Sequence, residues 1–500
     1  MSGSLAALLE AGAARHPARP FVVTRHYDIG YGDAADAVAR LRGVLAAHGV
    51  ARGSRVLLLA PNGAAFVFGW LALAGLDATM VPVHDQLPDE DVARIVADAG
   101  AAFVMGTGPL LAARAAGLAG IEPAHRVELA DPPLQRGCAP VGVTAAERPC
   151  AILYTSGTTG PPKGVVLSHE AYLAAAAVMA AGIGITREDR ILTALPLFHA
   201  NPQFYAVATA LHAGASVALL ERFSPSTFFE DATTLGATGF TYVGTVLAML
   251  SRKTAPSRGH GLRFCVGGGA AEPLWEEFEE RRGIRVHELY GATETGSFVT
   301  LTTLEAARRG SCGRARPDME IEILDPEDRP VAPGEPGEIA VRPLRPSVIF
   351  DGYHGRPDLT LARSRNLWFH TGDGGQQDSD GFLYFGGRLD NRVRRGGENV
   401  DPESVEAVLA GHPHVREVAV VGVPDEVMGQ EIKAVFVAAP EFDPQGLGAF
   451  LEGRLPRLAW PRFVEVRAAM PKTPTEKIAL DQLRRSDGST VDLRAEAGCP

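Results

Sequence analysis

The sequence has few cysteines, no excess of positive charge and no long hydrophobic run. Its five cysteines are scattered over 500 residues without a C-x-x-C pair, so neither a disulfide framework nor a zinc knuckle is predicted. The net charge of −11, from 48 basic and 59 acidic residues, argues against nucleic-acid binding and against docking on an anionic membrane. The longest apolar run, Ala64 to Leu76, is shorter than the ~20 residues that a membrane helix needs.

The N-terminal stretch has no basic segment followed by an apolar run, so no signal peptide is predicted and a cytoplasmic location is expected. A chain of this length is too long for one ordinary core, and two or more domains are expected. The hydrophobic fraction of 46% and the charged fraction of 21% are typical of a globular protein.

The pattern along the chain predicts an α/β fold. Helical segments alternate with short apolar runs, which favours parallel sheets covered by helices; the runs are 55–60, 79–83, 191–198, 215–220, 239–243 and 263–269. Short strands broken by proline and glycine follow at 316–385 and predict a small β-rich subdomain. We predict an N-terminal domain over 1–386, a junction at 387–390, and a small α+β domain over 391–500, whose first helix begins at Asp401 and Pro402.

A glycine-rich stretch, YTSGTTGPPKG at 154–164, lies between two strand-like segments. Small residues let successive backbone N–H groups converge on one point, where serine and threonine hydroxyls add further donors. The spacing differs from the G-x-x-x-x-G-K-[ST] loop, because Lys163 is followed by glycine. The alternative is a flexible linker, but the ordered flanks favour a phosphate grip.

The stretch resembles the phosphate loop of the adenylate-forming superfamily, which includes acyl-CoA synthetases, luciferases and the adenylation domains of peptide synthetases. Further motifs of that family follow in the family's order over essentially the whole chain: LPLFH (195–199), GGGAA (267–271), YGATET (290–295), TGD (371–373), GRLD (387–390) and PKTPTEK (471–477). The resemblance implies a large adenylation domain and a small mobile C-terminal domain. It leaves the substrate open.

The resemblance also implies how ATP is bound. It places the β- and γ-phosphates on the glycine-rich loop, and it places the adenine-side turn beside the YGATET segment. The residues implied in binding ATP are Thr155, Ser156, Gly157, Thr158, Thr159, Gly160, Lys163, Gly269, Ala270 and Glu288. Tyr290 stacks on adenine, Thr293 contacts phosphate and Glu294 is the Mg²⁺ ligand, while Asp373 and Arg388 bind the ribose hydroxyls. A single carboxylate suffices because Mg²⁺ often takes one or two carboxylates with waters and phosphates.

Two positions near the C-terminus carry the two half-reactions by resemblance. Lys477 supplies the cation where the acid's carboxylate meets the α-phosphate, although Glu476 stands where the family usually has glycine. Asp390 is the hinge about which the small domain rotates. After rotation, Gly396, Gly397 and Glu398 line the path of the CoA pantetheine arm.

The candidate walls of the acid pocket are also assigned by resemblance: His199, Asn201, Gln203, Tyr242, Val243, Gly267, Gly268 and Ser297. The segments FHANPQ (198–203), RRGGEN (394–399) and TEK (475–477) resemble a branch that contains crotonobetaine/carnitine CoA ligases. A buried quaternary ammonium needs a carboxylate or an aromatic cage, and these walls contain neither. They favour a neutral, mostly apolar acid.

The leading interpretation is an ATP-dependent acyl-CoA ligase using Mg²⁺. An adenylation enzyme that delivers to an acyl carrier protein is an alternative, but such domains usually carry an aspartate near the FH position. A fatty acyl-AMP ligase would need an insertion at the junction, which is short here. A non-catalytic nucleotide binder is disfavoured because Thr293, Glu294, Asp373, Arg388 and Lys477 are all present. A homodimer is compatible with the sequence.

Overall fold

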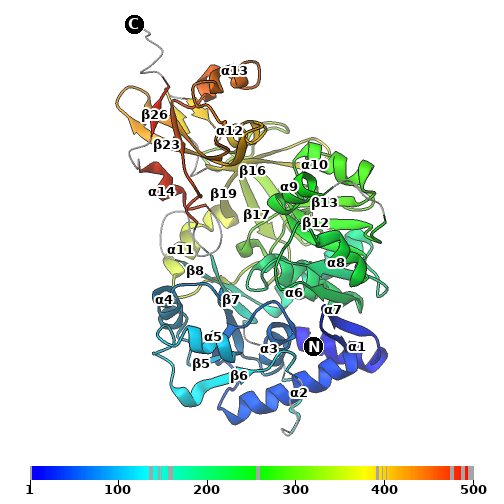
Figure 1. Cartoon of the computed structure of the whole chain (residues 1–500). Helices are drawn as coiled ribbons and strands as arrows, with labels where there is room; N and C mark the ends of the chain where they lie inside the picture. Colours follow the sequence, from blue (N-terminus) through cyan, green and yellow to red (C-terminus); the bar gives the residue numbers. More distant parts are fainter. Residues whose placement is uncertain are drawn as a thin grey trace.

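The computed structural model describes residues 3–133, 139–144, 147, 149–155, 162–254, 259–389, 393–396, 398–400, 402–472, 478–485 and 490–493. These residues form four β-sheets with helices around them (Figure 1). Three sheets belong to a large N-terminal domain, and the fourth belongs to a small C-terminal domain at one end of it. The predicted mixed α/β class is confirmed.

Two mostly parallel sheets build the greater part of the N-terminal domain. The nine-stranded sheet runs, in spatial order, β15 (Arg314–Ala315), β14 (Thr300–Leu301), β13 (Arg285–Tyr290), β12 (Phe264–Gly268), β11 (Gly239–Val243), β9 (Arg190–Thr193), β10 (Ser216–Leu219), β1 (Pro20–Val23) and β2 (Asp28–Gly30). The seven-stranded sheet runs β18 (Gly352–Tyr353), β8 (Lys163–Leu167), β7 (Ala151–Thr155), β4 (Thr79–Pro82), β3 (Arg55–Leu59), β5 (Phe103–Thr107) and β6 (Arg126–Leu129).

A layer of helices lies between these two sheets and shares one apolar core with both: α1 (Leu5–Arg15), α2 (Tyr31–Ala47), α3 (Ala64–Gly75), α6 (His169–Ile183) and α7 (Thr209–Ala213). Every residue of α3 is buried, which explains its unbroken apolar sequence. No helix in the described residues is long and apolar enough to cross a membrane.

The outer faces of the two sheets carry further helices. The seven-stranded sheet is covered by α4 (Asp89–Ala99) and α5 (Gly108–Ala113), and the nine-stranded sheet by α8 (Phe228–Thr234), α9 (Gly244–Lys253) and α10 (Glu272–Glu276). Three of the cysteines, Cys150, Cys265 and Cys312, are buried in the cores of the domain as free thiols. These three cysteines therefore serve as small apolar residues.

The β-rich region predicted over 316–385 is an antiparallel sheet of β16 (Met319–Leu324), β17 (Gly337–Pro343), β19 (Phe369–Gln377) and β20 (Leu383–Arg388), with α11 (Pro357–Ala362) nearby. The C-terminal sheet holds β21 (Val393–Arg395), β22 (Glu398–Val400), β23 (Val415–Asp425), β24 (Gly429–Ala438), β25 (Phe463–Val466) and β26 (Val491–Asp492). Its helices are α12 (Pro402–Leu409), α13 (Leu447–Leu451) and α14 (Leu480–Arg484). Asp401, the predicted N-cap, lies outside the described residues.

One strand prediction is wrong in its extent. The strand expected over 191–198 ends at Thr193, and the chain then turns into η2 (Pro202–Ala208), a π-helix. Pro196 lacks the N–H that a continuing ladder would need. The Asn62 side chain holds the turn instead, because its Nδ2 donates to Leu195 O at 2.9 Å and its Oδ1 accepts the Leu197 N–H at 2.8 Å. The LPLFH motif is therefore a loop.

Candidate active site

The carboxyl ends of three neighbouring parallel strands, β11, β12 and β13, bring many of the predicted site residues together. Tyr242 lies opposite Gly267, Val243 lies opposite Gly268, and Gly267 lies opposite Glu288 in the strand register. In open α/β sheets, ligands bind outside the carboxyl ends of the strands. Residues far apart in the sequence thus share one edge of the nine-stranded sheet.

Two glycines at the end of β12 are required by the backbone. A Cβ on Gly267 would lie 2.0 Å from the carbonyl oxygen of Tyr242, so a side chain there would push β11 and β12 apart. Gly269 has a φ of +92°, which is strained for other residues. The chain can therefore turn sharply beside β11 and β13 and leave backbone amides near the strand ends.

Glu288 on β13 fixes this turn. Its carboxylate accepts the N–H of Gly269 at 2.5 Å and the N–H of Ala270 at 3.1 Å, and the Tyr242 hydroxyl donates to it at 2.5 Å. Burial raises the pKa of Glu288 to about 7, against the opposing effect of these three donors. The side chain connects the adenine-side turn to the predicted acid pocket.

Tyr290, Asp373 and Arg388 form a chain of contacts across two sheets. The Tyr290 hydroxyl donates to Asp373 Oδ2 at 2.7 Å, and Asp373 Oδ1 lies 3.1 Å from Arg388 Nη1. Burial raises the pKa of Asp373, and the positive charge of Arg388 opposes that effect. Phe385, which no sequence motif singled out, lies against the Tyr290 ring at a centroid distance of 5.7 Å and an interplanar angle of 29°.

A second group of residues lies where the seven-stranded sheet meets η4 (Thr293–Thr295). Tyr353 on β18 donates its hydroxyl to Glu294 Oε1 at 2.9 Å, and the ammonium of Lys163 lies 5.8 Å from the centroid of the Tyr353 ring. Burial lowers the pKa of Lys163, and the nearby positive charge of Arg363 lowers it further. A carboxylate and a lysine thus both lie next to one tyrosine, the first at its hydroxyl and the second over its ring.

The glycine-rich loop begins and ends on paired residues. Thr155, the last residue of β7, lies opposite Lys163, the first residue of β8, in an antiparallel ladder. The five predicted phosphate contacts from Ser156 to Gly160 lie outside the described residues. The ladder places both ends of the loop at one point of the sheet edge, within reach of Tyr353 on the next strand.

The predicted wall of the acid pocket has fewer available polar groups than the sequence indicates. Gln203 is fully buried, accepts the Tyr172 hydroxyl at 2.6 Å and donates to Leu197 O at 2.8 Å, so its amide serves the fold. The hydroxyl of Tyr242 is likewise taken by Glu288. Asn201 donates to Tyr242 O at 3.0 Å, whereas its buried Oδ1 has no partner among the described residues.

The remaining wall candidates are apolar, aromatic or small. Val243 is 39% exposed at the strand end, which is unusual for valine beside a core strand and leaves its methyl groups open to a ligand. His199 packs on Phe198 at 4.2 Å between ring centroids, and Phe198 packs on His84 at 4.4 Å. Ser297 is buried with a φ of 77°, and its carbonyl accepts the Tyr205 hydroxyl.

The described residues include only some of the candidate site residues near and within the C-terminal domain. Gly396 has a φ of +58° between β21 and β22, and Glu398 contributes its backbone to β22. Lys477, Asp390 and Gly397 lie outside the described residues. The residues on either side of the Lys477 loop contact each other: Lys472 and Ile478 form an antiparallel bridge, and the Ala479 N–H donates to Pro471 O at 2.8 Å. The loop is therefore closed at its base.

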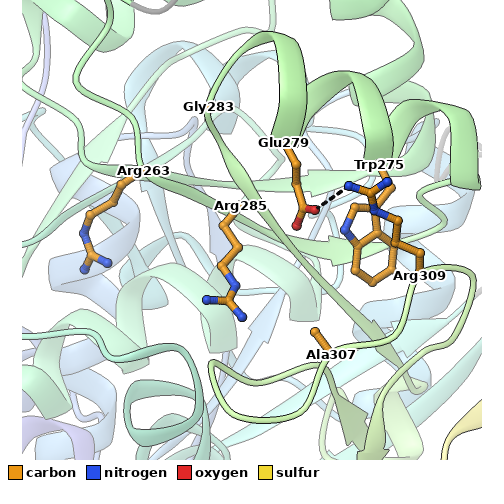
Figure 2. A pocket seen from close by; sticks show the side chains of 7 residues that line it. All are labelled: Arg263, Trp275, Glu279, Gly283, Arg285, Ala307 and Arg309. Atoms are coloured by element: carbon orange, nitrogen blue, oxygen red, sulfur yellow. Dashed lines mark hydrogen bonds and ion pairs between the residues drawn. The ribbon is translucent and has the colours of Figure 1, made fainter.

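A cavity of about 450 Å³ lies elsewhere, at the amino ends of β12 and β13 (Figure 2). Three arginines line it, Arg263, Arg285 and Arg309. Arg263 forms an ion pair with Asp189 at 2.6 Å, and Arg309 forms ion pairs with Glu279 and Glu280. Most of the positive charge that lines the cavity is therefore neutralised within the protein. The cavity contains none of the predicted site residues.

Three residues of the site were missed by the sequence analysis: Tyr353, Phe385 and Arg363. Each of them lies in a segment outside the motifs that is brought to the site by long-range strand pairing or by a turn. Tyr353, for example, reaches the site because β18 pairs with β8. No pattern in the neighbouring sequence marks Tyr353, because the contact depends on residues about 190 positions away.

Comparisons with known proteins identify the family. The model of the AMP-binding enzyme family matches residues 9–354, and that of the AMP-binding enzyme C-terminal domain matches 404–477. A crotonobetaine/carnitine–CoA ligase of Salmonella arizonae is 31% identical over 463 residues, which cover 87% of this chain and 89% of the relative. A sulfoacetate–CoA ligase of Cupriavidus necator is 32% identical over 501 residues, which cover 95% and 96% of the two chains.

Solved structures give the same result. The o-succinylbenzoate CoA synthetase of Bacillus subtilis, in complex with its acyl-adenylate intermediate, superposes with a TM-score of 0.88 at 28% identity. The match covers 97% of this chain and 99% of that one. The same enzyme has also been solved in complex with ATP and magnesium ion.

The chain belongs to the AMP-binding enzyme family, whose members matched here combine the same large domain and small C-terminal domain. Within that family it is an acid–thiol ligase of the AMP-forming class.

Proposed function

We propose that the protein activates a neutral, mostly apolar carboxylic acid with ATP and transfers the acyl group to CoA. The observation that supports this most strongly is the meeting of Lys163, Glu294 and the Tyr290–Asp373–Arg388 chain around the strand ends that carry the predicted acid pocket. Nucleotide and acid would then lie side by side at one edge of the nine-stranded sheet.

The reaction has two half-reactions. In the first, a carboxylate oxygen attacks the α-phosphorus of ATP, the bond to the bridging oxygen breaks, and pyrophosphate leaves. In the second, the CoA sulfur attacks the acyl carbon, the bond to AMP breaks, and the thiol proton passes to solvent. Two anions must meet in the first step, so the protein contributes mainly by positioning and by positive charge.

The residues described above suit that task. Tyr290 and Phe385 offer aromatic surface for adenine, and Asp373 with Arg388 offers an acceptor and a donor for the ribose hydroxyls. Asp373 Oδ1 is buried and paired with Arg388 at 3.1 Å, and a ribose hydroxyl could donate to the same carboxylate. Thr293, Thr155 and Lys163 would face the phosphates.

Glu294 fits a Mg²⁺ ion that travels with the nucleotide. One oxygen of its carboxylate accepts the Tyr353 hydroxyl, which leaves the other oxygen available to the ion. We propose that Glu294 is the carboxylate that the protein contributes to this ion. Mg²⁺ keeps several waters and takes phosphate oxygens as further ligands, and when bound it neutralises charge on the triphosphate.

The two half-reactions use the C-terminal domain in two positions. The chain passes from β20 to β21, and thus from one sheet to another, within the residues that follow Arg388. We propose that Asp390 is the pivot of this junction, within the 387–390 segment. Lys477 serves adenylation in one position, and Gly396, Gly397 and Glu398 flank the CoA arm in the other.

The proposed acid is neutral because the wall offers nothing to offset a buried cation. Among the described wall candidates there is no aspartate or glutamate, and the neighbouring Glu288 is occupied by Tyr242 and two amides. Phe198, His199 and Val243 offer aromatic and apolar surface, and Gly267 and Gly268 add no side chain to the wall. An aliphatic, aromatic or polycyclic acid with an uncharged tail fits that wall.

Crotonobetaine and carnitine should therefore be poor substrates, despite the 31% identity to a ligase of that name. The expected result is a higher kcat/KM for neutral acids, because a buried quaternary ammonium would lack a counter-charge. The measurement is the rate of pyrophosphate release over a panel of acids. A betaine with a clearly higher kcat/KM than every neutral acid would contradict the proposed substrate class.

A cytoplasmic location and a homodimer are further proposals that rest on the sequence, and an acyl carrier protein in place of CoA is the alternative acceptor. A carrier protein as the acceptor would give acyl-AMP but little acyl-CoA. The short junction after Arg388 and the absence of an acidic residue in FHANPQ support CoA instead.

A further inference from the structure

One buried carboxylate, that of Glu288, connects the adenine-side turn to the predicted acid pocket. We propose that the ionised carboxylate of Glu288 holds the turn at Gly269 and Ala270 in the form that accepts a nucleotide, so that nucleotide affinity falls when Glu288 takes up a proton. This inference rests on the proposed function and deepens it. Glu288 is a positioning residue, because protein donors occupy its oxygens and it acts on the ligand through the turn.

The turn itself is made of residues that cannot anchor it with side chains. Gly269 has a φ of +92°, and glycine has wide conformational freedom. On one side the turn touches the start of α9, since a Cβ on Gly244 would lie 2.2 Å from the Gly269 carbonyl oxygen. On the other side it donates two backbone N–H groups to Glu288. These two hydrogen bonds therefore fix the turn against β13.

Glu288 also sets the turn relative to the aromatic surface proposed for adenine. Glu288 and Tyr290 are two residues apart on β13, so their side chains leave the strand on the same face. The Tyr290 ring packs on Phe385, and its hydroxyl donates to Asp373 Oδ2 at 2.7 Å. A shift of the turn away from Glu288 would therefore change the distance between the turn and this aromatic surface.

The three contacts of Glu288 require an ionised carboxylate. Oε1 accepts the Gly269 N–H, and Oε2 accepts both the Ala270 N–H and the Tyr242 hydroxyl. A protonated carboxyl group gains a donor and loses acceptor capacity. With the proton on Oε2, the Tyr242 hydroxyl can donate to His287 O, 3.3 Å away, and accept from Glu288. The Ala270 N–H then faces a neutral hydroxyl oxygen, and its charge-assisted hydrogen bond weakens.

Burial brings the titration of Glu288 into the neutral range. It raises the pKa of Glu288 to about 7, and the three donors oppose it. The titratable groups that face Glu288 from neighbouring segments keep their protons over this range, because burial raises the pKa of each: Tyr242 on β11, Cys265 on β12, Tyr205 on η2 and Cys312 before β15. Burial lowers the pKa of His287, the preceding residue of β13, to about 4. Within this cluster, Glu288 is thus the group that changes charge between pH 6 and 9.

The test is titration calorimetry with AMP from pH 6 to 9 on the full-length protein and on Glu288→Gln, which cannot titrate at this position. The AMP phosphate itself titrates near pH 6, but it does so for both proteins, so the ratio of their Kd values isolates Glu288. From pH 9 to pH 6, we expect the Kd of the unsubstituted protein to rise about 3- to 10-fold relative to that of Glu288→Gln. The upper limit follows because a group with a pKa of about 7 is roughly one-tenth ionised at pH 6.

Two further variants separate this role from a structural one. Tyr242→Phe removes one donor to the carboxylate, so the midpoint of the pH dependence should rise by about one to two pH units, the scale of one charge-assisted hydrogen bond. Glu272→Gln is the matched control. Glu272 is an exposed glutamate at the start of α10, two residues after Ala270, and its replacement should leave the pH profile unchanged.

No acid substrate enters this test. A Kd ratio that stays constant from pH 6 to 9 would overturn the inference, and so would an unmoved midpoint in Tyr242→Phe or the same change of profile in Glu272→Gln. If Glu288→Gln does not fold, the midpoint of Tyr242→Phe against that of the unsubstituted protein decides alone. Failure of the unsubstituted protein to bind AMP at any pH would contradict the proposed function, an outcome distinct from AMP binding that does not depend on Glu288.

Discussion

Replacing Lys477 with alanine should slow acyl-adenylate formation about 10²–10⁴-fold, the scale of losing one charged contact in the transition state. We propose that this lysine supplies the cation where the carboxylate meets the α-phosphate and that it serves adenylation alone. Thioester formation from supplied acyl-AMP should be much less affected, because in our proposal the C-terminal domain has then rotated. Pyrophosphate release and thioester formation are measured separately, each in a single turnover.

Lys472→Ala is the matched control for this prediction. Lys472 is an exposed lysine at the base of the same loop, where it forms a backbone bridge with Ile478. Its replacement changes the charge of the loop by the same amount but should leave both half-reactions near normal. Equal loss of the two half-reactions in Lys477→Ala would contradict the role assigned to this lysine.

Replacing Asp390 with proline should produce the opposite pattern. Proline fixes φ and stiffens the junction between β20 and β21, so rotation of the small domain should be blocked. If the protein folds into the adenylating arrangement, pyrophosphate release stays near normal, while transfer to CoA from acyl-AMP falls steeply. The measurement is the same pair of single-turnover assays.

The Asp390→Ala variant distinguishes the role of the Asp390 backbone as a pivot from the role of its carboxylate charge. It removes the charge but leaves φ free, so transfer to CoA should be affected less than in Asp390→Pro. Normal transfer to CoA in the proline variant would show that the chain rotates about another residue. A loss of both half-reactions in the proline variant alone would indicate that the arrangement for adenylation was disturbed as well.

Much of the fold could be predicted from local patterns. The apolar runs at 55–60, 79–83 and 239–243 became β3, β4 and β11, because apolar β-branched and leucine residues between turn signals leave few alternatives. The apolar run from Ala64 became α3, a helix buried on all sides rather than a membrane helix. The strand predicted over 191–198 failed because a distant side chain, Asn62, holds its second half as a loop.

The candidate site was predicted from motifs that occur in a fixed order along the chain. Residues that lie outside these motifs could not be predicted in this way. Sequence order marks Glu294, Asp373 and Arg388, but it does not show which side chains support them. Tyr353 reaches Glu294 only because β18 pairs with β8, and Phe385 reaches Tyr290 only because two sheets meet there. These contacts depend on the three-dimensional arrangement of strands.

Burial also changes how the predicted acid pocket is interpreted. The sequence alone suggests that Asn201 and Gln203 both offer amides to the substrate. The structure places Gln203 entirely within the fold, bonded to Tyr172 and Leu197, because a buried amide must satisfy its donors and acceptors. Among the described wall residues, Asn201 keeps an unpartnered Oδ1 that could accept a hydrogen bond from a donor group on the tail of the acid.

The most direct test of the central claim is a stoichiometric assay with ATP, Mg²⁺ and a panel of neutral acids, with and without CoA. The account predicts that an accepted acid releases pyrophosphate in both cases, and that with CoA each pyrophosphate is accompanied by one AMP and one acyl-CoA thioester. Pyrophosphate and acyl-AMP formed from every accepted acid without any thioester in the presence of CoA would contradict the account.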